Sequence, residues 1–109
     1  MKRGSVVTVA TQGDYGKPRP AVVVQTDALN ETHGTILVCP LTTDLHEAPL
    51  LWIDIDPTPA NGLSQRSQLM ADRVITMRRR NIGKTIGQVE PETMSRLTQT
   101  LAMLLGIGD

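Results

Sequence analysis

The sequence predicts a mainly β protein with one C-terminal α-helix, in which a small curled sheet or barrel carries the helix on one side. Several short runs rich in Val, Ile and Thr are separated by turns that contain Gly or Pro, as is typical of small β-barrels. After residue 90 the apolar residues change to helical spacing. The length of 109 residues is that of a single domain, and we assign residues 1–109 to it.

The expected strands follow one another from the N-terminus. Apolar or β-branched runs occupy residues 5–10, 20–26, 35–40 and 50–56, with a short one at 84–89. Residues 67–72 and 74–77 are expected to form either a strand pair or one bent strand. Two glycines and a proline predict a loop at residues 12–18. Asn61 and Gly62, which tolerate positive φ, predict a turn at residues 57–62.

The expected helix runs from Pro91 to Leu105. Its apolar positions recur at helical spacing and are Met94, Leu97, Leu101, Leu104 and Leu105. Pro91 suits the first helical position, because its missing N–H would be unpaired there in any residue. Gly106 suits the C-terminal cap, because it adopts positive φ without strain.

Charge and aromatic content restrict the kinds of partner. The formal net charge is zero, which argues against non-specific coating of DNA but allows a local phosphate site. No Lys or Arg lies between Arg19 and Arg66, so if the fold joins the two flanks, one face is basic and another acidic. With one Trp, one Tyr and no Phe, a nucleic-acid site here cannot rest on a platform of several stacked aromatic rings.

The single Cys39 excludes an intrachain disulfide and fits a reducing compartment. Its apolar neighbours predict a buried strand thiol rather than a reactive nucleophile. No apolar run approaches the roughly 20 residues of a membrane span, and no signal-peptide pattern is present. We therefore expect a cytoplasmic protein.

Cofactor and metal motifs are missing from the sequence. His33 and His46 do not have the spacing of a zinc site, and no phosphate-binding glycine loop or GxSxG element occurs. We therefore expect no cofactor and no metal.

Polar residues at strand ends are the remaining candidates for chemistry. Arg19 stands between Pro18 and Pro20, which restrict the backbone around it, so its guanidinium loses little freedom when it binds a phosphate. The Thr42 hydroxyl could bind a phosphate oxygen, and Asp72 could take a proton or bind a base edge. Arg19 could equally form a surface salt bridge, Thr42 and Thr43 could be turn residues, and Asp72 could simply pair with Arg73.

Two further groups are considered. The basic run Arg78-Arg-Arg80, followed by Lys84, is expected to be a loop cluster, either solvated or adding salt-sensitive phosphate contacts. His46 lies in an acidic loop, where it is either simply exposed or in contact with substrate.

Four segments in order resemble the MazF/PemK-like toxins of bacterial toxin–antitoxin pairs, over nearly the whole chain. They are Arg3-Gly-Ser5, Lys17-Pro-Arg-Pro-Ala-Val-Val-Val24, Val38-Cys-Pro-Leu-Thr-Thr43 and Ser67-Gln-Leu-Met-Ala-Asp-Arg-Val-Ile-Thr76. After the last come Gly83-Lys-Thr-Ile-Gly87 and the helix. In the fourth segment the chain has Ala71-Asp-Arg73 where the family has Cys-Asp-Gln.

The resemblance implies an SH3-like curled barrel of the MazF/CcdB type, assembled as a homodimer. It also implies a metal-independent mRNA interferase, an endoribonuclease that cuts single-stranded mRNA at a short sequence and so inhibits growth. The 2′-hydroxyl would attack the adjacent phosphate and leave a 2′,3′-cyclic phosphate and a 5′-hydroxyl. The catalytic residues implied are Arg19, for transition-state stabilisation and protonation of the leaving oxygen, and Thr42, for a phosphate oxygen. The expected substrate-binding residues are Lys17, Thr43, His46, Asp72, Arg73 and Arg78.

A cognate antitoxin is the implied partner, a disordered acidic segment laid over the basic face. Two alternatives remain open at this stage. One is a CcdB-like poison of DNA gyrase that does no chemistry, although such proteins end in a penultimate Trp and this chain ends in Leu105-Gly-Ile-Gly-Asp109. The other is a catalytically weak relative that binds antitoxin or RNA.

Overall fold

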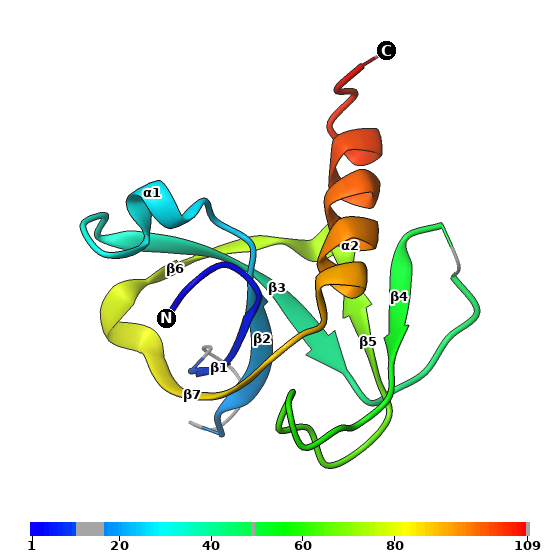
Figure 1. Ribbon diagram of the computed structural model, residues 1–109, viewed down its shortest axis with the longest axis horizontal. Coiled ribbons are helices and arrows are strands. Elements are labelled where there is room, and N and C mark those ends of the chain that lie inside the picture. The colour runs from blue at the N-terminus through cyan, green and yellow to red at the C-terminus, as the bar shows by residue number, and fades with distance from the viewer. Residues whose placement is uncertain (11–16, 49, 109) are drawn as a thin grey trace.

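A curled antiparallel sheet with one long helix forms the protein (Figure 1). The computed structural model describes residues 1–10, 17–48 and 50–108. Within them the elements are β1 (Ser5–Val9), β2 (Arg19–Val23), α1 (Asp27–Asn30), β3 (Thr35–Thr42), β4 (Trp52–Ile55), β5 (Ser67–Met70), the 3₁₀ turn η1 (Ala71–Arg73), β6 (Ile75–Arg78), the 3₁₀ turn η2 (Arg79–Asn81), β7 (Ile82–Gln88) and α2 (Pro91–Leu104).

The strands form one sheet in the order β4-β5-β3-β2-β1-β7, and β6 also pairs with β3. The two strands β5 and β6 therefore share one edge of β3. Leu41 and Thr42 pair with β5, whereas Thr35 to Val38 pair with β6. Residues 67–78 thus form two strands, β5 and β6, joined through the bend at η1; they pair with β3 and not with each other.

The sheet is curled but not closed into a barrel. Strands β6 and β7 follow one another in the chain through η2, yet they pair with β3 and β1 rather than with each other. The expected fold class, mainly β with a C-terminal helix, is confirmed, and the curled-sheet version of it describes the structure better than a closed barrel.

Among the other local expectations, some are confirmed and some are wrong. The strands lie within or close to their expected ranges, and β3 continues two residues further, to Thr42. The expected loop at residues 12–18 lies, up to residue 16, outside the described residues. The helix α1 was not expected; it has four residues, too few for an apolar period. The basic run was expected to be a loop, but it forms the end of β6, η2 and the start of β7.

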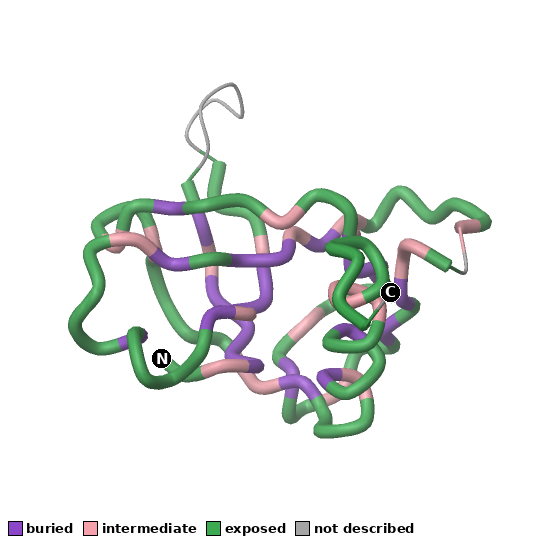
Figure 2. The backbone as a smooth tube through the Cα atoms, turned by 90° about the horizontal axis from the view of Figure 1, so that it is seen from above, coloured by how far each residue is buried: buried purple, intermediate pink, exposed green. Residues whose placement is uncertain are grey.

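The two faces of the sheet carry two separate clusters of buried side chains, and Figure 2 marks the buried residues along the backbone. One cluster lies on the concave side and consists of Val7, Val9, Ala21, Val23, Ile36, Val38 and Met77. The other lies between the opposite face and α2, and Leu97 of α2 is completely buried in it. Because side chains alternate along a strand, each central strand contributes to both clusters.

The helix α2 begins and ends as the sequence predicts. Pro91 is in the first turn, and Gly106 has φ +70°. The Gly106 N–H donates to the Met103 carbonyl and the Ile107 N–H to the Ala102 carbonyl, which is the Schellman pattern. The last turn projects past the sheet (Figure 1), and Leu105 is 73% exposed. No helix in the described part of the chain is long and apolar enough to cross a bilayer.

The turn at residues 57–62 packs directly on β7. Gly62 has φ +70°, as expected, and a Cβ there would lie 2.1 Å from the Ile86 carbonyl oxygen. A Cβ on Gly87 would lie 2.3 Å from the backbone of Asn61. The Asn61 side chain is buried and binds the backbone of Asp56, Thr58 and Leu63. Glycine is therefore required on both sides of this contact.

We expect Leu97→Ala to lower the free energy of unfolding by about 3 kcal/mol, because it leaves a cavity between α2 and the sheet. Leu105→Ala, in the exposed end of the same segment, should change it by no more than about 0.5 kcal/mol. Urea unfolding followed by circular dichroism measures both variants. Equal effects would contradict the packing described.

Candidate functional site

A proline ends the hydrogen-bond ladder between β2 and β3. The pairing of these strands runs Val23–Val38, Val22–Cys39 and Ala21–Pro40 and extends no further. The Val24 N–H donates to the Leu37 carbonyl, so by alternation Pro20 faces β3, whereas Pro40 faces the other edge of β3. Pro20 has no N–H to donate, so the ladder loses a hydrogen bond just beyond Ala21. Each strand remains held on its other side, since Arg19 pairs with Val9 of β1.

Arg19 and Thr42 come directly after this point. Continued by two residues along each strand, the register that pairs Ala21 with Pro40 places Arg19 opposite Thr42. Both are two residues from that pair, so their side chains leave the same face of the sheet, at the rim of the concave apolar cluster. Residues directly opposite on neighbouring strands are about 5 Å apart, which is within the reach of one phosphate group.

Thr42 is held in place by its neighbours. It pairs with Gln68 of β5, and its hydroxyl oxygen accepts the Asp44 N–H at 3.0 Å. That bond uses the oxygen as an acceptor, so the hydroxyl proton can be donated to a phosphate oxygen.

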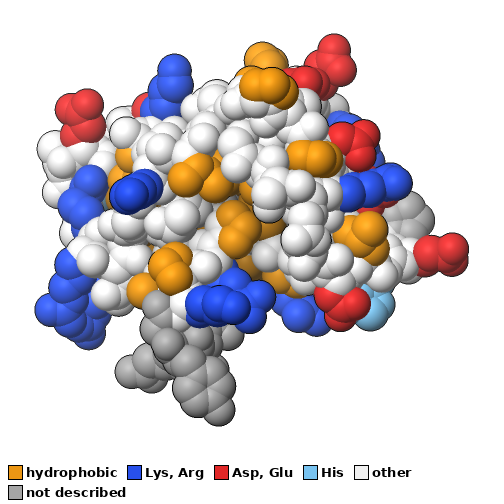
Figure 3. Space-filling view, turned by 90° about the horizontal axis from the view of Figure 1, so that it is seen from below, with side chains coloured by type: hydrophobic (Ala, Val, Ile, Leu, Met, Phe, Trp, Pro, Cys, Tyr) orange, Lys and Arg blue, Asp and Glu red, His pale blue; other side chains and the backbone are white. Residues whose placement is uncertain are grey.

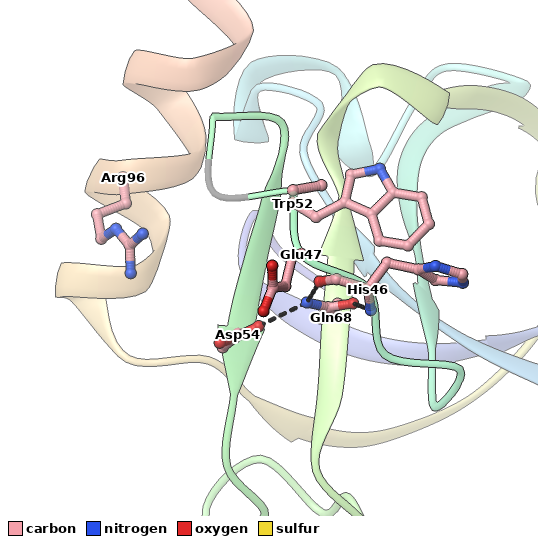
Figure 4. A pocket seen from close by; sticks show the side chains of 7 residues that line it. His46, Glu47, Trp52, Asp54, Gln68 and Arg96 are labelled. Atoms are coloured by element: carbon pink, nitrogen blue, oxygen red, sulfur yellow. Dashed lines mark hydrogen bonds between the residues drawn. The ribbon is translucent and has the colours of Figure 1, made fainter.

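Arg19, Thr42, Gln68 and Asp54 form a row of polar side chains across β2, β3, β5 and β4. Gln68 also fixes the loop after β3. It is 5% exposed and pairs with Thr42 on one side and Asp54 of β4 on the other. Its carbonyl oxygen accepts the His46 N–H at 2.8 Å, and its Nε2 donates to the His46 carbonyl at 2.7 Å and to Asp54 Oδ1 at 2.8 Å (Figure 4). The amide therefore ties the backbone at His46 to β4 and β5.

Trp52 contacts three residues that were expected to bind substrate. Its Nε1 donates to Asp72 Oδ1 at 2.8 Å, and the Arg73 guanidinium lies 5.2 Å from the ring centroid. The His46 ring meets it edge to face at 5.4 Å, and His46 Nε2 lies 3.1 Å from Asp44 Oδ2. The structure therefore brings His46, Asp72 and Arg73 together, and Asp72 binds the indole as well as standing beside Arg73 in the chain.

The other expected substrate residues lie at differing distances from this cluster. Lys17 and Thr43 are exposed and close in the chain to Arg19 and Thr42. Arg78 pairs with Thr35, at the opposite end of the eight-residue strand β3 from Thr42. At about 3.3 Å per residue, that is about 23 Å away. Arg78 is therefore not part of the same cluster within one chain.

Arg79 is not a solvated member of a loop cluster. Its side chain is half-buried, with Nε and Nη2 donating to the His33 carbonyl at 3.1 and 2.9 Å and Nη2 also to the Asn30 carbonyl. It therefore fastens the segment after α1 to the end of β6. Within the basic run, only the exposed residues Arg78 and Arg80 fit the expectation of a solvated cluster.

The charges are partly separated, as the sequence suggested. In Figure 3, Lys and Arg side chains dominate the left border and the lower middle of the face, whereas most Asp and Glu side chains lie toward the right. The separation is incomplete because Arg66 pairs with Asp54 at 3.1 Å and with Asp56 at 3.6 Å.

Cys39 is completely buried, as expected. Burial, and in second place the negative charge of Asp72, raises the pKa of its thiol to about 12. A thiol of this kind is inert, since the thiolate is the reactive form. Within the described ranges, no three His, Cys, Asp or Glu side chains are grouped so that they could hold a metal ion.

Sequence reasoning missed Trp52 and Gln68 as site residues. Trp52 is the sole tryptophan of the chain and stands at the start of a strand, a signal that could have been used. Gln68 gives no such signal, because its role depends on the pairing of β5 with both β3 and β4.

The fold and the candidate site together define a class: a small curled-sheet protein whose sheet register brings an arginine and a threonine toward each other at the end of two neighbouring strands. The comparisons name the family. Residues 2–105 match the family described as PemK-like, MazF-like toxin of type II toxin–antitoxin systems, and the chain belongs to it. The resemblance predicted from the sequence is confirmed.

Individual relatives agree. The chain is 43% identical over 108 residues, 98% of each chain, to a probable endoribonuclease MazF of Mycolicibacterium smegmatis. A solved endoribonuclease from a mycobacterial species, in complex with its cognate antitoxin, superimposes with a TM-score of 0.82 at 26% identity, covering 100% of this chain and 98% of that one. The Mycobacterium tuberculosis toxin MazF-mt6, at 18% identity, shares the fold with a TM-score of 0.81 and coverage of 96% and 99%.

We expect iodoacetamide at pH 8 to leave Cys39 of the folded protein unmodified, because the thiol is buried and its pKa is raised to about 12. In denaturant the same thiol should react at the rate of a free cysteine, which mass spectrometry of timed samples will show. Rapid alkylation without denaturant would mean that the thiol is accessible.

Proposed function

We propose that this protein is the endoribonuclease toxin of a type II toxin–antitoxin pair, cutting single-stranded mRNA at a short sequence and thereby inhibiting growth. The proposal is supported chiefly by the sheet register, which pairs Ala21 with Pro40 and, when extended by two residues along each strand, brings Arg19 opposite Thr42. Membership of the toxin family, together with relatives named as endoribonucleases, supports it.

The proposed reaction is an internal transfer. The ribose 2′-oxygen bonds to the adjacent phosphorus as its proton is lost, and the bond from phosphorus to the 5′-oxygen breaks. The 5′-oxygen then takes up a proton, and the products are a 2′,3′-cyclic phosphate and a 5′-hydroxyl. Because the nucleophile belongs to the substrate, the reaction needs no activated water, and we propose that it proceeds without a metal or cofactor.

Arg19 and Thr42 act where charge develops. The guanidinium stays protonated and presents a planar fork of donors, so Arg19 stabilises the pentavalent phosphate and donates a hydrogen bond to the leaving oxygen. The Thr42 hydroxyl donates to a non-bridging oxygen. Around them we assign contacts with substrate to Lys17, Thr43, His46, Asp72, Arg73 and, at the far end of β3, Arg78.

The partners follow from the same assignment. The solved relative in complex with its cognate antitoxin supports an antitoxin partner for this chain. We propose a homodimer that acts in the cytoplasm, where mRNA is present. The CcdB-like alternative is not favoured, because the family match and the named relatives point to RNA cleavage.

We expect Arg19→Ala to lower the cleavage rate by about 10²- to 10³-fold, the usual loss when one preorganised donor to a transition state is removed. Thr42→Ala should have a smaller effect, and Thr42→Ser should restore most of the rate. The assay uses purified protein, a mixed transcript pool and EDTA, and detects cyclic-phosphate ends.

Arg80→Ala is the matched control, since Arg80 is an exposed arginine in η2. It should cleave within about twofold of the wild type, as expected for a surface substitution. Full activity of Arg19→Ala would refute the assigned mechanism.

We expect the cognate antitoxin to block cleavage competitively, because its acidic segment and the RNA phosphates need the same positive groups. Raising the RNA concentration should therefore raise the antitoxin concentration required for half-inhibition. Simultaneous binding of antitoxin and uncleavable RNA without mutual weakening would show that the two surfaces are separate.

A further inference from the structure

We propose that the pocket between the loop after β3, strand β4 and helix α2 binds a nucleobase beside the scissile phosphate and selects bases that carry an exocyclic amino group. The pocket has a volume of about 330 Å³ and is lined by His46, Glu47, Ala48, Trp52, Asp54, Gln68 and Arg96 (Figure 4). This size is at the lower end of the range for small-ligand sites. The inference rests on the proposed function.

The position of the pocket fits a neighbouring nucleotide. Gln68 pairs directly with Thr42, the residue assigned to the phosphate, and Asp54 is the next member of the same row. Side chains directly opposite on paired strands project from one face. A nucleotide whose phosphate lies between Arg19 and Thr42 therefore has its base within reach of β5 and β4.

The charges in the pocket match a base rather than a second phosphate. Asp54 and Glu47 contribute carboxylates to one side, and an ionised carboxylate only accepts hydrogen bonds. Glu47 has no hydrogen-bond partner among the residues that the structure describes, so its oxygens are available to a ligand donor. Arg96, on α2, faces them from the other wall (Figure 4) and can donate to ring or carbonyl acceptors.

The frame around the reading groups is rigid. Gln68 uses both ends of its amide on His46 and Asp54, and Asp54 also accepts from Arg66 at 3.1 Å. Trp52, which lines the pocket, is held at its Nε1 by Asp72. Gln68 is accordingly a positioning residue, whereas Glu47 and Arg96 are the groups that read the base.

The selection follows from base chemistry. Cytosine, adenine and guanine present an amino group, and carboxylates accept from the cytosine amino group in nucleic-acid recognition. Uracil presents a carbonyl oxygen where cytosine has the amino group, and this oxygen would face the carboxylate with no proton between them. The pocket should therefore reject uracil.

Matched oligoribonucleotides around a mapped cut site test this. At each position flanking the cut, cytosine is replaced by uracil, or guanine by inosine, which removes only the amino group. At one position the wild type should lose about tenfold in cleavage rate, the usual effect of one base contact. Glu47→Gln should reduce that ratio to about twofold, because an amide also donates to a carbonyl. Glu92→Gln, the same change at an exposed site on α2 outside this pocket, should keep it.

Binding is measured separately from cleavage. Trp52 is the only tryptophan, so its fluorescence should change when 2′-O-methyl RNA oligomers, which lack the nucleophile, fill the pocket. Oligomers with cytosine should bind about tenfold tighter than those with uracil at the same place.

The outcomes separate the two proposals. Normal cleavage without amino-group discrimination, or with the same discrimination in Glu47→Gln, would overturn the base pocket and leave the proposed function standing. A wild type that cleaves no RNA would contradict the proposed function, and the fluorescence titration would then still decide the pocket. Loss of antitoxin binding in Glu47→Gln with unchanged base preference would assign the pocket to the partner and overturn the proposal.

Discussion

The candidate site depends on the end of one hydrogen-bond ladder. Between β2 and β3 the backbone pairing stops at Ala21 and Pro40, because Pro20, the next residue of β2 on that edge to face β3, has no N–H. The strands do not become loose there, since β1 still holds Arg19 and β5 still holds Thr42. Pro18 and Pro20 also limit the backbone freedom of Arg19, so less entropy is lost when its guanidinium binds.

Those parts of the fold that depend on local chemistry could be predicted from the sequence. Pro91 and Gly106 mark the ends of α2 through backbone preferences that operate within a few residues, and the β-branched runs mark most strands in the same way. The sequence left open whether residues 67–77 form a strand pair or one bent strand, because the outcome depends on β5 and β6 pairing with two stretches of the same edge of β3. Arg79 was misjudged for a similar reason. Its partners are carbonyls of residues 30 and 33, more than forty positions away in the chain.

The site was predictable to the extent that its residues carry a motif. Arg19 and Thr42 stand in recognisable segments, and the register of the sheet supports their pairing. The grouping of His46, Asp72 and Arg73 could not be predicted in this way, because these residues meet only through Trp52. The pairing of β4 with β5 places Trp52 beside Met70 and hence next to η1. Gln68 illustrates the limit most clearly. A buried amide that holds a loop backbone has no sequence pattern of its own, and its importance appears only when its three partners are seen together.

The row of side chains across β2, β3, β5 and β4 changes from positive to negative charge along its length. It begins with the positive charge of Arg19, continues through the hydroxyl of Thr42 and the amide of Gln68, and ends with the negative charge of Asp54, with Glu47 nearby. The Asp54 carboxylate is paired with Arg66 at 3.1 Å, so Glu47 provides most of the repulsion that a phosphate would meet there, about 1 to 4 kcal/mol at 4 Å, depending on how well water screens it. Near Arg19 the same group is attracted by a comparable amount. In the proposed arrangement RNA lies on this face in one register, with a phosphate at the arginine end and a neutral base at the carboxylate end, and the sign of the charge then decides both which bond is broken and which base lies beside it.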